Sequence, residues 1–358
     1  MAVAFNSSWL SGLMGGQKSP NIAIDIGSQV IKMIAVRRQK GQMPLVRHVQ
    51  MEVAPEELNE GGLGDPAALG EIFRGMHRLL GVRERQVAFA IPYASTYRHT
   101  VLLPANLKKE DLDVQAEKSA HDILPISLDE AYWDYDVIGP SSNVGQNEVL
   151  LVAARRDLVD ERLAALEAAN LNPVHVDVDL YCLERLYRKL SSRLPVSEVV
   201  GLLDLGGRGF RLHVFYQNQA VYSRENNFGG AALVTDFARH YSMSQGQALG
   251  LILEHHGPLG WEKEVLAPWM ENLAAEVAHE LQMFSAASAY PALSMLWLCG
   301  GGALLKGVTQ AIGAETGVET REFNPFRLAE QPRAESSSIL GMGSALAVAY
   351  GALLAEKQ

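Results

Sequence analysis

The stretch LLDLGGRGFRLHVF, residues 202–215, reads as a strand, a glycine turn and a second strand. A second stretch, AIDIGSQVIKMIAV at residues 23–36, matches it and places Asp25 opposite Asp204. In both stretches the aspartate ends an apolar run and opens an Asp-x-Gly turn. Two copies of one module, with aspartates 179 residues apart (204 minus 25), indicate an internal duplication.

The paired turns form a candidate phosphate site. A glycine at such a turn can adopt positive φ and expose successive backbone N–H groups to an anion. Asp25 and Asp204 would hold Mg²⁺, directly or through water, and Lys32 would reach a phosphate oxygen as a point charge. The remaining matched pairs are Gly27 with Gly206, Ser28 with Gly207, and Lys32 with Arg211. A single turn of this kind is an ordinary hairpin sequence, so the indication depends on the pair.

A third glycine-rich segment, CGGGALLKG at residues 299–307, follows an apolar run. A strand that passes through Gly300, Gly301 and Gly302 into a helix presents free N–H groups and the positive helix end to an adenosine or phosphate group. The segment is not a Walker A loop, because Lys306 is not followed by Ser or Thr. Close packing of one backbone against another is the alternative interpretation of these glycines.

Composition narrows the classes of function. A chain of 358 residues is too long for one ordinary core, so two or more lobes are expected. The net charge of −10 argues against electrostatic binding of DNA, RNA or anionic lipid. Cys182 and Cys299 form neither a disulfide framework nor a zinc motif, which fits a reducing, cytoplasmic compartment. Residues 1–19 lack a signal-peptide pattern and are expected to be a flexible leader, and the apolar run 339–354 is shorter than the ~20 residues that span a bilayer.

The hydrophobic pattern predicts the remaining elements. Residues 21–55 are expected to form a meander of three strands, followed by a helix over 67–80 and a strand near 85–93. A β-α-β-β-α insertion then follows: a strand over 98–103, a helix over 108–122, strands over 131–138 and 148–154, and a helix over 157–169. Residues 229–289 are mostly helical, 295–299 form a buried strand that leads through the glycines into a helix, and a single small-residue helix closes the chain.

Two pairs of polar residues could be read as a catalytic or a metal site, but a structural or surface role explains each pair as well. Asp134 and Asp136 lie on one face of an expected strand, as paired catalytic carboxylates would. A solvated strand face is the interpretation adopted, because the sequence identifies no environment that would raise the pKa of an acid. His255 and His256 are adjacent and point in different directions, which disfavours a metal site.

Taken in order, these elements resemble the actin-like ATPase superfamily, in which two ribonuclease-H-like lobes clamp a nucleotide. Within it the chain most resembles the PilM family of type IV pilus assembly proteins, which is related to FtsA. The likeness extends from about residue 21 to residue 350. The segments that carry it beyond the generic fold are EKSAHDILPISLDEAYWDYDVI, VHVDVDLYCLER and VYSRENNFGGAALVTDFARHY.

The resemblance implies an α/β fold of two duplicated lobes with two smaller subdomains. The implied divisions are residues 20–97 with 174–198 for the first lobe (1A-like), 98–173 for an inserted α+β subdomain (1C-like), 199–229 with 290–340 for the second lobe (2A-like), and 230–289 for a helical subdomain (2B-like). The closing helix, over 341–355, is expected to pack on the first lobe.

The resemblance also implies a site for ATP or ADP with Mg²⁺, and a partner. The implied site residues are Asp25, Gly27, Ser28 and Lys32 in the first hairpin, Asp204, Gly206, Gly207 and Arg211 in the second, Gly300, Gly301 and Gly302 in the adenosine loop, and Gly229 and Gly230 beside the nucleotide. In the family, a groove between the inserted subdomain and the first lobe receives the cytoplasmic N-terminal peptide of PilN, a protein of the inner membrane. Other platform or motor proteins of the pilus would be further partners.

The sequence departs from the family at three places. Gln29 stands where a hydroxyl residue is common, and Arg208, Gly209 and Phe210 occupy the second turn where hydroxyls often line the pocket. Glu254 and His255 stand near the position of a lysine that lies beside the base and ribose in related proteins. Each departure would weaken nucleotide binding, unless Arg208 or Arg211 adds phosphate contacts instead. Nucleotide binding is expected, with hydrolysis weak or absent.

Two other functions share these features. Sugar and acetate kinases contain the same duplicated hairpins, but such a phosphotransferase needs a carboxylate base aimed at the substrate hydroxyl. The sequence does not identify such a base, because Asp177 and Asp179 in HVDVDLY are equally explained as hairpin and helix-cap residues. A filament-forming protein of the FtsA type usually ends in a linker and an amphipathic membrane helix, whereas this sequence ends in LLAEKQ directly after the last expected core helix.

Overall fold

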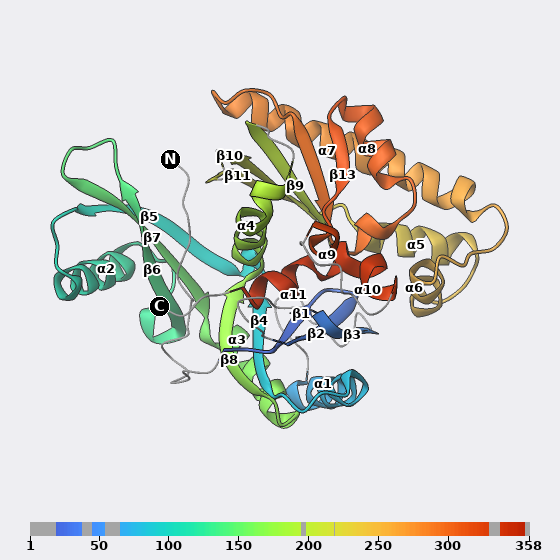
Figure 1. Cartoon of the computed structure of the whole chain (residues 1–358), viewed down its shortest axis with the longest axis horizontal. Coiled ribbons are helices and arrows are strands. Elements are labelled where there is room, and N and C mark those ends of the chain that lie inside the picture. The colour runs from blue at the N-terminus through green and yellow to red at the C-terminus, as the bar shows by residue number, and fades with distance from the viewer. Residues whose placement is uncertain are drawn as a thin grey trace.

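The computed structural model describes residues 19–37, 45–53, 65–194, 198–217, 219–328 and 337–354. The leader expected over 1–19 lies outside this part of the chain, apart from Ser19. The chain forms two five-stranded sheets and one three-stranded sheet. Figure 1 shows helices between and around the two large sheets, and the smaller sheet projecting to one side. Among the described residues, no helix is both long enough and apolar enough to cross a membrane.

The first sheet has the strand order β3-β2-β1-β4-β8. β1, β2 and β3 form the predicted antiparallel meander, and β4 and β8 add in parallel. Its strands are β1 Ile22–Ile26, β2 Val30–Val36, β3 Leu45–Glu52, β4 Gln86–Ile91 and β8 Asn172–Val178. Successive residues of β1 face opposite sides, so Ile22 and Ile24 pack towards α1 (Pro66–Leu80) while Ala23 packs towards α4 (Asp179–Leu190).

The second sheet repeats this arrangement with the order β11-β10-β9-β12-β13. Again three strands form an antiparallel meander and two add in parallel. The strands are β9 Val199–Leu205, β10 Phe210–Tyr216, β11 Gln219–Asn226, β12 Met295–Cys299 and β13 Glu319–Glu322. The matching order and directions give each copy of the sequence module the same place in its sheet.

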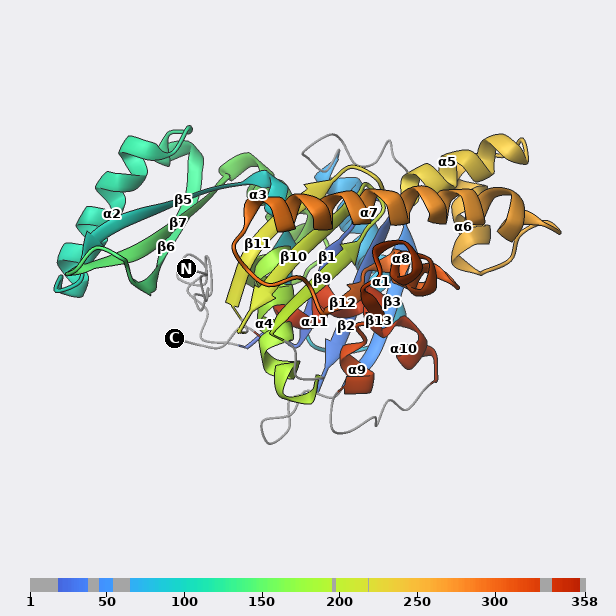
Figure 2. The same ribbon diagram turned by 90° about the horizontal axis from the view of Figure 1, so that it is seen from above.

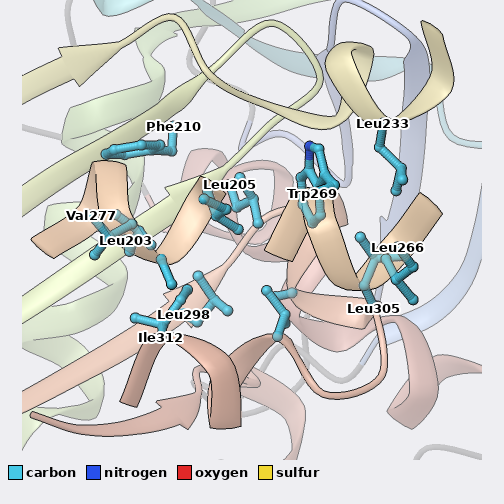
Figure 3. Close-up of a cluster of buried hydrophobic side chains, with 14 of the residues drawn as sticks. Leu203, Leu205, Phe210, Leu233, Leu266, Trp269, Val277, Leu298, Leu305 and Ile312 are labelled. Carbon is cyan, nitrogen blue, oxygen red and sulfur yellow. The ribbon is translucent and has the colours of Figure 1, made fainter. Parts of the chain in front are cut away.

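The helices that follow the second meander share one hydrophobic cluster with this sheet. They are α5 Gly230–His240, α6 Gln245–Leu253, a π-helical turn at Glu262–Leu266, α7 Ala267–Ala287 and α8 Val308–Thr316. Figure 3 shows the core beneath them, where Leu203, Leu205 and Phe210 from the sheet meet Trp269 and Val277 from α7. Trp269 also donates its indole N–H to the carbonyl of Gly229 at 3.2 Å, which fixes the loop that enters α5.

The smaller sheet confirms the expected β-α-β-β-α order. Its elements are β5 Thr96–Pro104, α2 Lys109–Ile123, β6 Ala131–Pro140, β7 Gln146–Arg155 and α3 Arg156–Ala168, with strand order β5-β7-β6. This unit has a hydrophobic cluster of its own, which includes Val101, Ala116 and Val149. Figures 1 and 2 show that it extends away from the two large sheets, while α3 returns to pack beside α1.

The two large sheets share a hydrophobic core that is filled by α4 and α11 (Ala347–Ala352). Ala88 of the first sheet, Leu202 of the second and Leu183 of α4 belong to one buried cluster. Across this core the ring of Tyr187 stacks on that of Phe215 with centroids 4.2 Å apart. The lobes are therefore joined at their base by continuous packing.

The closing segment was predicted as one helix and is instead broken. It forms α10 Ser337–Met342, a 3-10 turn at Gly343–Leu346, and then α11. A Cβ on Gly343 would lie 2.0 Å from Oδ1 of Asn324, and the carbonyl of Ser344 accepts a hydrogen bond from Gly300 N at 3.0 Å. Contacts with other segments therefore impose the break.

The segment after the triple glycine also differs from its prediction. A 3-10 turn occupies Gly301–Leu304, and α8 begins only at Val308. The remaining short elements are α9 Pro325–Leu328 and 3-10 turns at Tyr93–Ser95, Leu128–Glu130 and Ser191–Arg193.

Candidate functional site

The two hairpins meet at the centre of the molecule. Strand register places Asp25 opposite Lys32 in the first hairpin and Asp204 opposite Arg211 in the second. The residues matched between the two sequence copies therefore occupy equivalent positions in the two sheets. The turns touch, because a Cβ on Gly207 would lie 2.5 Å from Oε1 of Gln29 and 2.8 Å from Oγ of Ser28.

A cavity of about 410 Å³ lies around these turns. It is lined by all but one of the residues predicted for the nucleotide site. These are Asp25, Gly27, Ser28, Lys32, Asp204, Gly206, Gly207, Arg211, Gly230, Gly300, Gly301 and Gly302.

Gly229 is the exception and lies behind the second turn. A Cβ there would be 2.6 Å from the carbonyl oxygen of Gly207 and 2.8 Å from that of Gly206. The first amides of α5 bond to the same turn, since Gly230 N donates to Gly206 O at 3.0 Å and Ala231 N to Gly207 O at 2.7 Å. Both amides therefore hydrogen-bond to the turn and are not available to a ligand.

The glycine loop after β12 packs against the second hairpin. Gly300 has φ of +86°, and a Cβ there would lie 2.4 Å from Leu205 O and 2.6 Å from Oδ1 of Asp204. A Cβ on Gly302 would overlap the Leu205 side chain, whereas Gly301 has open space around it. Only glycine combines this φ with this approach, so close packing explains Gly300 and Gly302, and Gly301 leaves room in the cavity.

The hairpin cations are both paired. Lys32 Nζ lies 2.8 Å from Oδ2 of Asp25. Arg211 forms a hydrogen-bonded ion pair with Asp179, and it lies 3.9 Å from Oδ2 of Asp204 and 3.8 Å from Oε1 of Glu225. Burial opposes a charged Lys32, but Asp25 and Asp204 outweigh it and raise the Lys32 pKa. Burial likewise opposes a charged Arg211, and Asp179 and Asp204 raise its pKa.

Asp204 has a more distant cationic partner than Asp25 or Asp179. It is buried, and this desolvation raises its pKa despite the opposing effects of Arg211 and Lys32. In the described part of the chain its one side-chain hydrogen bond is from Cys299 Sγ at 3.9 Å. Asp25, by contrast, is neutralised by Lys32 at close range.

A cation would be held most directly by Asp204, a buried carboxylate whose nearest cationic group is Arg211 at 3.9 Å. Over the whole cavity lining the charges balance, since the carboxylates of Asp25, Asp179, Asp204 and Glu225 face the cations Lys32, Arg162, Arg208 and Arg211. Within the described residues, no three His, Cys, Asp or Glu side chains could hold a metal ion together. Mg²⁺ would therefore depend on Asp204, water and phosphate oxygens, which is a common set for this ion.

The wall on the side of α5 and α6 is apolar. It consists of Leu233, Val234, Leu249, Ile252 and Leu253. Such a surface suits the face of an aromatic base. His255, one of the predicted departures, lines the cavity here, whereas Glu254 does not.

Asp179 and Arg162 line the cavity although neither was among the predicted site residues. Asp179 begins α4, and the sequence supported only a cap or a base at that position. Arg162 of α3 is 5% exposed, and burial lowers its pKa to about 10. Its Nη1 donates to Leu158 O at 2.5 Å, and Nε has no hydrogen-bond partner in the described chain. Because RDLVDERLAAL resembles a solvated helix, only the packing of α3 reveals that this arginine is buried.

The carboxylates considered for a phosphotransferase base are both engaged. Asp177 is fully buried, lies 2.8 Å from Arg185 and 3.2 Å from His175, and these partners outweigh burial to hold its pKa at about 2. Asp179 is paired with Arg211. A general base works best with a pKa near the operating pH, so Asp177 does not fit that role.

The solvated strand face expected at Asp134 needs correction. Asp134 is half-buried, and burial raises its pKa, with smaller effects from Asp136 and Asp113. Tyr135 on the same strand donates its hydroxyl to Asp113. The sequence did not reveal this environment because α2 supplies Asp113 from 21 residues upstream (134 minus 113).

Comparisons with known proteins match nearly the whole chain. A family model described as type IV pilus assembly protein PilM matches residues 23–357. A chain in the solved PilM-PilN type IV pilus biogenesis complex is 22% identical with a TM-score of 0.78, covering 96% of this chain and 100% of that one. The ethanolamine utilization protein EutJ from Carboxydothermus hydrogenoformans is 14% identical with a TM-score of 0.56, covering 98% and 95% respectively. These likenesses confirm the expected actin-like α/β fold.

Proposed function

The chain belongs to the PilM family of type IV pilus assembly proteins, and from this membership we propose that it is an ATP-binding component of the pilus assembly platform. It acts in the cytoplasm and is held at the inner membrane through its partners. Its role is to support pilus biogenesis and twitching motility.

The proposal that the protein binds nucleotide rests on the two hairpins that line one cavity. The two glycine turns and the Lys32 ammonium line the cavity and suit phosphates, and the apolar wall near Leu249 suits a base. Asp204, a buried carboxylate without a close cationic partner, would be the residue that holds Mg²⁺. ATP or ADP with Mg²⁺ is the ligand class that satisfies all of these groups.

Calorimetric titration of ATP with Mg²⁺ into Asp204→Asn tests this site. The variant keeps the shape of the side chain but loses its charge, so the affinity is expected to fall about tenfold or more, as for a lost charged hydrogen bond. Chelating Mg²⁺ should weaken binding to the wild type and have little further effect on the variant. The control is Asp236→Asn, which alters an exposed pair with Arg239 on α5. Equal affinities in all three proteins would show that the cavity does not bind nucleotide in this way.

The proposed partner is PilN. The related solved structure is a complex of PilM with PilN, and this chain carries an inserted subdomain, β5 to α3, beside its first sheet. We propose that the cytoplasmic N-terminal peptide of PilN docks between this subdomain and the first lobe. Other platform or motor proteins would bind elsewhere.

Fluorescence anisotropy with a labelled PilN N-terminal peptide tests the docking. Saturable binding is expected for the native peptide and none for a scrambled peptide of the same composition. If the native peptide shows no affinity either with or without ATP and Mg²⁺, the docking proposal is wrong.

Hydrolysis is proposed to be weak or absent. Asp179 follows β8 directly and lines the cavity. Its carboxylate is paired with Arg211 and is therefore not free to accept a proton. ADP release should therefore stay near background over hours with water or with hydroxyl substrates. Release that rises with a sugar or acetate would favour the phosphotransferase alternative.

A further inference from the structure

Asp179 lies where three parts of the molecule meet. Its side chain is 9% exposed. Oδ2 pairs with Arg211 on β10 of the second sheet. Oδ1 accepts hydrogen bonds from Tyr93 N at 2.9 Å and from Leu180 N at 2.7 Å. One buried carboxylate thus connects the second lobe, the start of α4 and the segment at Tyr93.

The segment at Tyr93 is the entrance to the inserted subdomain. The turn Tyr93–Ser95 runs directly into β5, the first strand of that sheet. Arg98 on β5 binds back to the turn, because Nη1 donates to Tyr93 O at 2.5 Å and to Thr96 Oγ1 at 2.6 Å. Its guanidinium carbon also lies 3.4 Å from the centre of the Tyr93 ring. A movement of the Tyr93 backbone would therefore move the start of β5 with it.

The other end of this connection lies in the cavity. Arg211, Asp179, Pro92 and the turn residues Ala94 and Ser95 all line it. Among the described residues, Arg211 pairs closely only with Asp179, since Asp204 and Glu225 lie at 3.9 and 3.8 Å. A phosphate that reaches Arg211 competes with Asp179 for the same guanidinium, which binds phosphate in the same forked geometry as carboxylate.

We propose that Asp179 is a positioning residue that couples phosphate occupancy of the cleft to the orientation of the inserted subdomain. A phosphate on Arg211 displaces the Asp179 carboxylate, and the displaced carboxylate moves the Tyr93 amide and β5 with it. This inference rests on the proposed function, because it takes the inserted subdomain as the docking site of the partner peptide. Linkage requires the effect to be reciprocal, so the peptide changes nucleotide affinity by the same factor.

The test measures the peptide affinity at zero and at saturating ATP with Mg²⁺, in the wild type and in Asp179→Asn. The asparagine oxygen still accepts from Tyr93 N, but the charge pair with Arg211 is lost. In the wild type the two affinities should differ by about fivefold or more, the usual range for coupled sites. In Asp179→Asn both ligands should still bind, and the two peptide affinities should agree within about twofold. Asp236→Asn is the control and should keep the wild-type ratio.

Several outcomes would overturn the inference. One is a wild type that binds both ligands without coupling, and another is an Asp179→Asn variant that keeps the full ratio. Loss of folding would not explain loss of coupling, because melting temperatures and both single affinities are measured on the same samples. If the wild type binds neither nucleotide nor peptide, the proposed function fails first.

A measurement without ligands tests the connection from Arg211 through Asp179 to Tyr93 separately from the proposed function. Amide hydrogen exchange is followed at residues 93–98 in the wild type, Arg211→Gln and Arg211→Lys. Removing the charge should speed exchange roughly fivefold or more, because Asp179 loses its anchor to the second lobe, and lysine should restore part of the protection. Unchanged exchange in Arg211→Gln would overturn the connection from Arg211 to Tyr93 whatever the ligands do.

Discussion

Glu184 shows how one buried side chain makes stability depend on pH. It lies on α4 with its side chain 4% exposed and pairs with Arg188. Burial outweighs this pairing and raises its pKa to about 7 from an ordinary 4.5. Between these values the folded state binds more protons than the unfolded state. The contribution to stability is complete below pH 4.5 and is lost as the pH rises through 7.

Urea unfolding at pH 5 and pH 8 checks this effect. Relative to Glu184→Gln, the free energy of unfolding of the wild type should fall by roughly 3 kcal/mol between the two conditions, as the shift in pKa requires. Glu71→Gln is the matched control, because Glu71 is an exposed partner of Arg74, and it should show no such difference. A wild type and a Glu184→Gln variant with parallel pH profiles would contradict the assignment.

At this scale the sequence predicted the residues of the hairpins but not all of their partners. The match of Lys32 with Arg211 is local, since each sits in register opposite its own aspartate. The pairing of Arg211 with Asp179 is not local, because it joins one lobe to the other. Sequence periodicity carries no information about how two lobes approach, and so Asp179 was considered only as a cap or a base.

At the scale of elements, the contact of α11 with α4 depends on a single glycine. A Cβ on Gly351 would lie 2.2 Å from the carbonyl oxygen of Cys182, which is backbone and cannot rotate away. Gly351→Ala should therefore destabilise the protein by about 1–3 kcal/mol, as overpacking usually does. Denaturant unfolding measures the difference.

The same substitution at Gly75 is its control. Gly75 lies in α1, and a Cβ there meets no atom within 4 Å. Gly75→Ala should be neutral or stabilising by up to about 1 kcal/mol, because alanine favours the helix. If both variants were equally stable, the approach of α11 to α4 would be looser than described.

Most elements could be predicted because their signals are local. The apolar alternation of β1 and β2 and the helical period of α1 each lie within one short segment. The broken closing helix could not be predicted, since its break depends on Asn324, 19 residues before Gly343 (343 minus 324), and on the Gly300 amide. Small residues in that segment indicated tight packing but not the point where the helix ends.

At the scale of the whole molecule, duplication made the fold predictable. Two modules with the same turn require two sheets with the same order, and the structure has both. The shared core beneath them was not predictable, because it combines alanines of the first sheet with α4, α11 and aromatic residues of the second. That core makes the two lobes one unit, although the inserted subdomain has a cluster of its own.

Thiol labelling tests whether the lobes open together. Cys182 on α4 and Cys299 on β12 are both 0% exposed and both belong to the shared core, and burial raises the pKa of each well above its ordinary value. Since only the thiolate reacts, neither should react with an aromatic disulfide reagent in the native protein except through opening of the core. Both should then react at one rate that rises with urea in step with global unfolding, whereas the fully unfolded chain should react at once. Fast reaction of one cysteine alone, in the absence of urea, would show that one part of the shared core opens without the other, and that the two lobes do not open as a unit.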